Sequence, residues 1–199
     1  ELVFEGDFTG VGVDYIMINN SIKFTGKDAV FNNVTFVISS DNVTIDGFKL
    51  IQNNSDIALI TFSDVSNVVI SNNVLEYIAM SGADSYAIYA SNVNALKLLN
   101  NTFTYVGNTA GTNVNNVIRV EGDGKKSTNV LVDGNVFDIS IPSTDVKYDD
   151  NYNAISYTDG LVFYGCENLT VSNNNITLNY NNVTGGSDTI HVITVGNRI

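Results

Sequence analysis

Asn67-Val68-Val69-Ile70-Ser71-Asn72-Asn73-Val74 belongs to a segment that occurs five times along the chain and decides its fold. The other copies begin at Asn42, Ala95, Asn129 and Asn168, so successive copies are 25, 28, 34 and 39 residues apart. Each copy alternates apolar and polar residues over a short strand and ends at Asn or Gly, residues typical of tight corners. A strand that returns at this period predicts a solenoid.

Each repeat divides into three short strands, and the quoted segment is the second of them. The third follows the Asn corner, as at 74–77 and 102–106. The first is centred on one apolar residue per repeat: Ile60, Ile88, Ile118, Leu161 and Ile190. Alternating residues such as Val68 and Ile70 point inward, and only stacked coils can bury them. We therefore predict an all-β parallel β-helix solenoid with three short strands per coil.

The paired Asn residues at the corners have a structural explanation. A corner between strands needs positive φ, which Asn tolerates better than other non-Gly residues. Stacked coils would also bring the amides into a hydrogen-bonded ladder. The corners concerned are Asn72/Asn73, Asn100/Asn101, Gly134/Asn135 and Asn173/Asn174. We interpret these residues as scaffold.

Several Asn residues also begin Asn-x-Ser/Thr triplets of the glycosylation type. They are Asn19, Asn33, Asn42, Asn53, Asn100, Asn168, Asn175 and Asn182. A chain rich in Asn, Ser and Thr produces such triplets by chance, and several fall where a sugar would block ladder packing. We favour incidental occurrence, and the sequence leaves modification open.

The composition excludes some classes of partner. Net charge is −12, with 9 Lys and Arg against 21 Asp and Glu. Nucleic acid and anionic membranes both require clustered positive charge, so neither is an expected partner. No apolar run approaches the roughly 18 residues of a membrane span. Cys166 is the single cysteine, so no disulfide forms within the chain.

We expect residues 1–199 to form one β-helix domain. Residues 41–199 read as regular coils, whereas residues 1–40 read as looser entry coils. Phe4 and Phe8, in the first twelve residues, are candidates to cover the end of the apolar column. Because the sequence begins without Met and ends in a strand-like run, we interpret it as a fragment of a longer protein, monomeric in isolation.

Function is expected where the repeats differ, in the insertions between a third strand and the next first strand. These insertions are 79–85, 107–115, 140–158 and 180–187. The longest contains Tyr148, Asp149, Asp150, Tyr152 and Tyr157. Tyr offers rigid amphipathic area, and Asp binds sugar hydroxyls or Ca²⁺. The alternative is a solvated loop whose Tyr rings shield the strand edge.

Two further acids align when the first strands are superposed. Asp159 and Asp188 stand two residues before Leu161 and Ile190, so stacking would place them about 5 Å apart. Such a pair requires a cation, a shared proton or a neighbour such as Asn116. It is a candidate metal site or a remnant of glycosidase chemistry. We favour two solvated acids.

Two segments carry a resemblance to a known family: Asp41-Asn42-Val43-Thr44-Ile45-Asp46-Gly47-Phe48 and Ser172-Asn173-Asn174-Asn175-Ile176. They resemble the right-handed parallel β-helix, or pectin-lyase-like, superfamily, over about residues 15–199. Within it, the Asn-rich, acidic and Lys-poor composition is similar to the adhesin-like surface proteins of methanogenic archaea. The resemblance implies an extracellular module at the cell surface or cell wall that contacts other cells or their glycans.

A second resemblance is to polygalacturonases. Tyr157-Thr158-Asp159-Gly160 resembles their Asn-Thr-Asp-Gly motif, and Gly186-Ser187-Asp188 falls where the family has Gly-Asp-Asp. One of three expected carboxylates is missing, which leaves too little to activate water. A polysaccharide lyase would need a catalytic Arg or Lys. Arg119 is the candidate, although we expect it to pair with Glu121 or Asp123.

We predict a non-enzymatic adhesin module that binds a cell-surface glycan or protein. The candidate ligand-binding residues are Tyr148, Asp149, Asp150, Tyr152, Tyr157, Asp159 and Asp188. No cofactor is required by this interpretation, and Ca²⁺ is a candidate ligand of the acids. The alternatives are a carbohydrate-active hydrolase or lyase and a passive stalk spacer.

Overall fold

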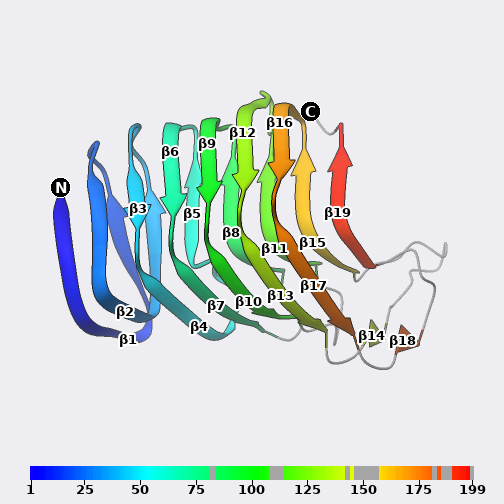
Figure 1. Ribbon diagram of the computed structural model, residues 1–199, viewed down its shortest axis with the longest axis horizontal. Helices are drawn as coiled ribbons and strands as arrows, with labels where there is room; N and C mark the ends of the chain where they lie inside the picture. Colours follow the sequence, from blue (N-terminus) through cyan, green and yellow to red (C-terminus); the bar gives the residue numbers. More distant parts are fainter. Residues whose placement is uncertain are drawn as a thin grey trace.

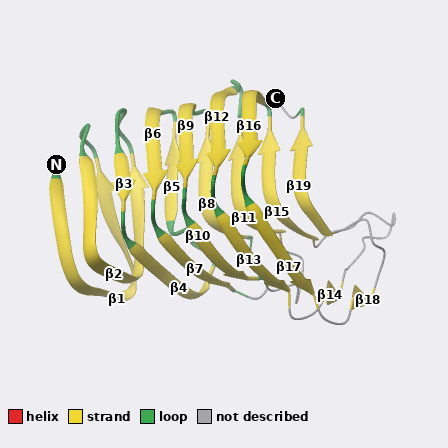
Figure 2. Ribbon diagram, viewed as in Figure 1, coloured by secondary structure: helices red, strands yellow, loops and turns green. Residues whose placement is uncertain are grey.

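The chain folds into a β-solenoid whose coils follow one another along a single axis (Figure 1). The computed structural model describes residues 1–80, 84–107, 114–141, 144–145, 157–180, 183–184 and 190–197. Strands and turns make up this described part, which contains no helix (Figure 2). The predicted all-β parallel β-helix is therefore confirmed. Among the same residues, no helix is long and apolar enough to span a membrane.

Three faces run along the solenoid, and each receives one strand per coil in parallel register. The first face contains β5 (Ile60–Ser63), β8 (Ser85–Ser91), β11 (Val114–Glu121), β15 (Tyr157–Tyr164) and β19 (Ile190–Gly196). The second contains β3 (Thr44–Asp46), β6 (Ser66–Ser71), β9 (Asn94–Leu99), β12 (Ser127–Asp133) and β16 (Cys166–Ser172). The third contains β4 (Lys49–Ser55), β7 (Val74–Ala79), β10 (Thr102–Val106), β13 (Val136–Ile141) and β17 (Asn175–Tyr180).

The first forty residues form two full coils. β1 (Leu2–Ile18) and β2 (Lys23–Ile38) are long strands that each bend through all three faces. β2 pairs with β3 at its start, with β4 in its middle and with β5 at its end. Phe4 packs against the core, and Phe8 stacks on Phe31 with ring centroids 4.4 Å apart. Both aromatic rings therefore lie over the end of the apolar column.

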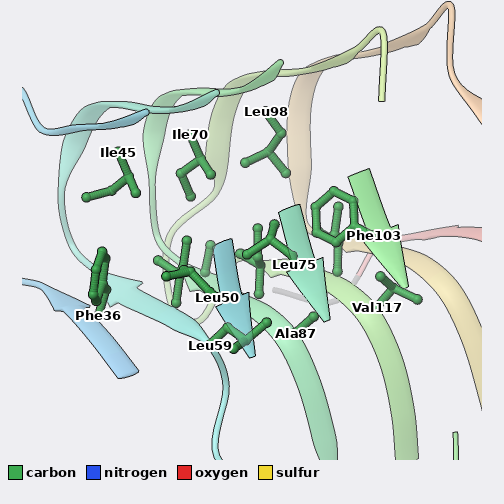
Figure 3. Close-up of a cluster of buried hydrophobic side chains, with 14 of the residues drawn as sticks. Phe36, Ile45, Leu50, Leu59, Ile70, Leu75, Ala87, Leu98, Phe103 and Val117 are labelled. Atoms are coloured by element: carbon green, nitrogen blue, oxygen red, sulfur yellow. The ribbon is translucent and has the colours of Figure 1, made fainter. Parts of the chain in front are cut away.

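The core consists of apolar rows that run from coil to coil (Figure 3). One row from each face is Ile45–Ile70–Leu98, Leu50–Leu75–Phe103 and Leu59–Ala87–Val117, and all nine side chains are buried. The alternation predicted for the second strands is confirmed, from Val43 and Ile45 to Val130 and Val132. Leu169 and Val171, in the fifth copy, are partly buried against the same core. Each fully buried Val, Leu or Ile contributes about 1.5–3 kcal/mol to folding.

The predicted Asn ladder lies at the corner between the second and third faces. Asn73, Asn101, Asn135 and Asn174 follow one another, and the Nδ2 of each of the first three donates to the Oδ1 of the next at 3.0 Å. That Oδ1 also accepts the backbone N–H of the preceding Asn at 2.8–3.0 Å. The residue before each of them has positive φ, between 53° and 69°: Asn72, Asn100, Gly134 and Asn173. The ladder thus joins four coils inside the solenoid.

A second set of positive-φ residues lies on the second face. It comprises Asn42, Asn67, Ala95, Asn129 and Asn168. Asn67 Nδ2 donates to Asn42 Oδ1 at 3.0 Å, and Asn168 Nδ2 to Asn129 Oδ1 at 3.1 Å. Ala95 occupies the Asn position in the middle coil with φ 59°, and Asn94 Oδ1 accepts the Asn129 amide instead. Ala95 is therefore a strained exception in a regular array.

Candidate functional site

The residues predicted to bind a ligand are described only in part. Tyr148, Asp149, Asp150, Tyr152 and Asp188 lie outside the described residues. Tyr157 and Asp159 lie on β15 of the first face, where the backbone is described and the side chains are not. The Tyr- and Asp-rich insertion therefore stays a prediction.

The two insertions nearest the C-terminal end meet at one corner of the solenoid. β14 (Thr144–Asp145) follows β13, β18 (Val183–Thr184) follows β17, and the two pair in parallel (Figure 1). Both leave the third face before the chain returns to the first, as the insertion pattern predicts. Any surface that they form therefore adjoins the edge at which the first-face strands begin.

The register of the first face corrects one prediction. Ile60, Ile88, Ile118 and Leu161 are in register, but Leu161 pairs with Ile193 and not with Ile190. This shift of three residues puts His191 opposite Asp159. The predicted stacking of Asp188 on Asp159 is therefore wrong. The error arose because either register of 190–195 sets apolar residues opposite Leu161 and Phe163.

The first face carries a compact group of aromatic and charged side chains on its outer side. This tyrosine–arginine cluster comprises Tyr86 and Tyr89 of β8, Arg119 and Glu121 of β11, and Tyr164 of β15. The Arg119 guanidinium lies over two rings, 5.8 Å from the Tyr86 centroid and 5.4 Å from the Tyr164 centroid. The rings of Tyr86 and Tyr89 are 5.4 Å apart. Three successive coils thus contribute to one surface.

Hydrogen bonds and an ion pair hold the cluster together. Arg119 Nε and Nη2 each lie 2.8 Å from Glu121 Oε2, which confirms the predicted pairing with Glu121. The Tyr89 hydroxyl donates to Glu121 Oε1 at 2.5 Å. Because Arg119 and Glu121 are 13% and 19% exposed, solvent screens this pair less than a surface salt bridge. Its geometry is therefore fixed before any ligand arrives.

Both β8 tyrosines are phenols at neutral pH. Burial, followed by the hydrogen bond to Glu121, raises the pKa of Tyr89 to about 12. Burial, followed by the charge of Asp84, raises the pKa of Tyr86 further. A protonated phenol both donates and accepts hydrogen bonds. The cluster therefore presents neutral aromatic rings and hydroxyls beside Arg119, whose charge is balanced by Glu121.

Metal and nucleophile chemistry find little support in the described part of the chain. No group of three or more His, Cys, Asp or Glu side chains that could hold a metal ion occurs there. Ca²⁺ at Asp149 and Asp150 remains a prediction. Burial raises the pKa of Cys166 to about 11, so its thiol stays protonated at neutral pH. Cys166 is half-buried and packs on the core, as a small apolar residue does.

The first strands predicted around Ile88 and Ile118 carry Tyr86 and Arg119, but the sequence analysis did not combine these two residues into a site. The sequence did contain a signal for this cluster, because the alignment on Ile88, Ile118 and Leu161 also brings Tyr89 and Arg119 into register. Tyr164 lies one coil further along the same outer surface. Comparison of the chain with models of protein families and with curated proteins gives no match. The parallel β-helix fold and this cluster are therefore the basis for a functional proposal.

Proposed function

We propose that this chain is a non-enzymatic recognition module of a cell-surface adhesin, which binds a glycan or protein of another cell. The observation that carries the proposal is the tyrosine–arginine cluster on the outer side of the first face. Tyr and Arg are enriched at binding hot spots, because they combine large contact area with hydrogen bonding. The location, extracellular at the cell surface or cell wall, follows from the resemblance to archaeal adhesin-like proteins and belongs to the same proposal.

The scaffold supports recognition because it is rigid. Arg119 is fixed by two rings and by Glu121, so a ligand does not have to order it on binding. The strands beneath the cluster belong to a core whose side chains are buried. The insertions that join the third face to the first begin beside these strands and can add contacts. Tyr148 and Tyr152 are the proposed residues there, together with Tyr157 at the start of β15.

The register also bears on the enzymatic alternative. Glycoside hydrolases use two carboxylates that flank the scissile bond. The residue opposite Asp159 in the next coil is His191, so neighbouring coils do not supply a carboxylate pair at this position. A lyase would need a free cation, and Arg119 is paired with Glu121 and stacked between rings. We therefore propose binding without catalysis and without a required cofactor.

Binding to fixed cells and to a glycan array tests the proposal. We expect the wild-type chain to bind, and Arg119→Ala combined with Tyr164→Ala to lower affinity at least about tenfold. Tyr15→Ala is the matched control, because Tyr15 is 53% exposed on β1, away from the cluster. If the wild type binds and the double variant binds as well as the Tyr15→Ala control, the cluster is not the binding surface. Absence of any binding would favour the spacer, and release of reducing ends from an acidic polysaccharide would favour the enzyme.

A further inference from the structure

A groove of about 320 Å³ opens on the outer side of the corner between the second and third faces, whereas the tyrosine–arginine cluster lies on the first face. Three successive coils form it, those of β2, of β3 and β4, and of β6 and β7. Its lining residues are Asp28, Ala29, Val30, Gly47, Phe48, Lys49, Asn72 and Val74. All of them lie among the residues that the structure describes.

The groove exists because one coil has a longer corner than the next. Thr25 pairs with Asp46 and Val30 pairs with Lys49, so four residues of β2 face only two residues, 47 and 48. Between the next two coils the corners have equal length, because Asp46 pairs with Ser71 and Lys49 with Val74. Within the longer corner of β2, Lys27 and Asp28 are exposed, whereas Ala29 is buried. Asp28 has φ 54° and lines the groove.

The walls of the groove combine polar groups with an apolar patch. The Asp28 carboxylate is exposed and makes no hydrogen bond or ion pair with any residue that the structure describes. Asn72 is exposed, and its Nδ2 donates to Asp46 Oδ1 at 2.7 Å, so its Oδ1 is available as an acceptor. Lys49 Nζ is 2.8 Å from Glu76 Oε1. Val74, 37% exposed, supplies apolar surface between these groups.

This chemistry suits a sugar ring. Ligand sites combine an apolar surface with a few placed polar groups, and their volumes run from about 300 to 1,000 Å³. The groove lies at the small end of that range, which fits one or two rings. The Asp28 carboxylate can accept two sugar hydroxyls, while the C–H face of the ring packs on Val74. An acidic sugar is disfavoured, because Asp28 is unpaired and the only cation of the lining, Lys49, is already paired with Glu76.

We propose that this groove is a subsite for an uncharged sugar unit, separate from the tyrosine–arginine cluster. The inference rests on the proposed recognition of glycans and adds a second place of contact on another side of the solenoid. Asp28 is the main acceptor of sugar hydroxyls, Asn72 is a second polar contact, and Val74 is the stacking surface. Two such contact regions on one rigid body would strengthen attachment to a polymeric glycan.

Amide NMR titration with four named sugars tests the subsite: galactose, mannose, N-acetylglucosamine and glucuronic acid. We expect at least one uncharged sugar to shift the amides of Asp28, Asn72 and Val74, and glucuronic acid to leave them unchanged. Asp28→Gly removes the carboxylate and keeps the positive φ without strain. It should weaken binding about tenfold, as the loss of a charged hydrogen bond does. Val74→Gln, which fills the groove, should weaken binding as well.

Asp56→Asn is the matched control, because it removes one exposed carboxylate at a distance from the groove and should bind like the wild type. Sugar shifts that map to β8, β11 and β15, or binding that Asp28→Gly retains, would overturn the subsite and leave glycan recognition intact. A preference for glucuronic acid would overturn the assignment of an uncharged ligand. If none of the sugars binds and the glycan array is also negative, both the subsite and the proposed glycan recognition are rejected.

Discussion

Truncation of Asn101 is the sharpest test of how this solenoid is held together. Its buried side chain makes four hydrogen bonds. Oδ1 accepts the backbone N–H and the Nδ2 of Asn73, both at 3.0 Å. Nδ2 donates to the Ile70 carbonyl at 2.9 Å and to Asn135 Oδ1 at 3.0 Å. Asn101→Ala removes all four bonds and leaves the Asn73 backbone N–H without its partner.

The expected cost follows from the orphaned groups. A buried donor or acceptor left unsatisfied costs about 1–3 kcal/mol. Asn73 Nδ2 keeps its bond to the Ile45 carbonyl, and Asn135 Oδ1 keeps the Asn101 backbone N–H, so part of the ladder survives. We therefore expect Asn101→Ala to lower the free energy of unfolding by about 3–4 kcal/mol, a large part of the 5–15 kcal/mol typical of a domain.

Urea denaturation followed by circular dichroism measures this change. Asn100→Gly is the matched control, because Asn100 is the exposed corner neighbour and its φ of 53° is compatible with Gly. The control should change the free energy of unfolding by less than about 0.5 kcal/mol. A loss below about 1 kcal/mol for Asn101→Ala, or equal losses for both variants, would refute the assignment of stability to the ladder.

Three further predictions concern the corners and the cluster. Ala95→Asn should raise the free energy of unfolding by about 0.5–1 kcal/mol, because Ala95 has φ 59° and Asn tolerates that region better; an unchanged urea midpoint would contradict this. Gly26→Ala should lower the free energy of unfolding by more than about 1 kcal/mol, because the added Cβ would lie 2.6 Å from the Gly47 carbonyl oxygen. A thermal unfolding midpoint at or above that of the wild type would exclude that clash. Tyr89 should ionise near pH 12, because burial and the Glu121 hydrogen bond favour the neutral phenol. The contribution of Tyr89 to the free energy of unfolding is therefore complete below pH 10 and is lost as pH rises towards 12. Spectrophotometric titration of the wild type and of Tyr89→Phe checks this. A Tyr89 phenol that ionises near pH 10 would count against it.

Much of the fold was predictable because the repeat is regular. The alternation at Val68 and Ile70 and the doublet Asn72/Asn73 each follow from local physical chemistry, inward burial in one case and positive φ in the other. The coils of residues 1–40 were less visible, because their corner between the second and third faces carries no Asn doublet. They use residues such as Asp28 and Asn33 with positive φ inside long bent strands.

The candidate site was less predictable, because register and side-chain contacts are tertiary properties. Ile190 and Ile193 are equally apolar, and the pairing of whole strands decides between them. The stacking of Arg119 on Tyr86 and Tyr164 joins residues from three coils separated by long insertions. The groove beside Asp28 depends on a difference in corner length between adjacent coils, which the repeat alignment treated as irregularity.

Hydrogen–deuterium exchange of the chain, alone and saturated with the best-binding glycan from the array, locates the recognition surface. We propose that this surface is the outer side of the first face. We expect slower exchange on binding in β8, β11 and β15, around Tyr86, Arg119 and Tyr164. Protection confined to the second face, or none on β11, would contradict it.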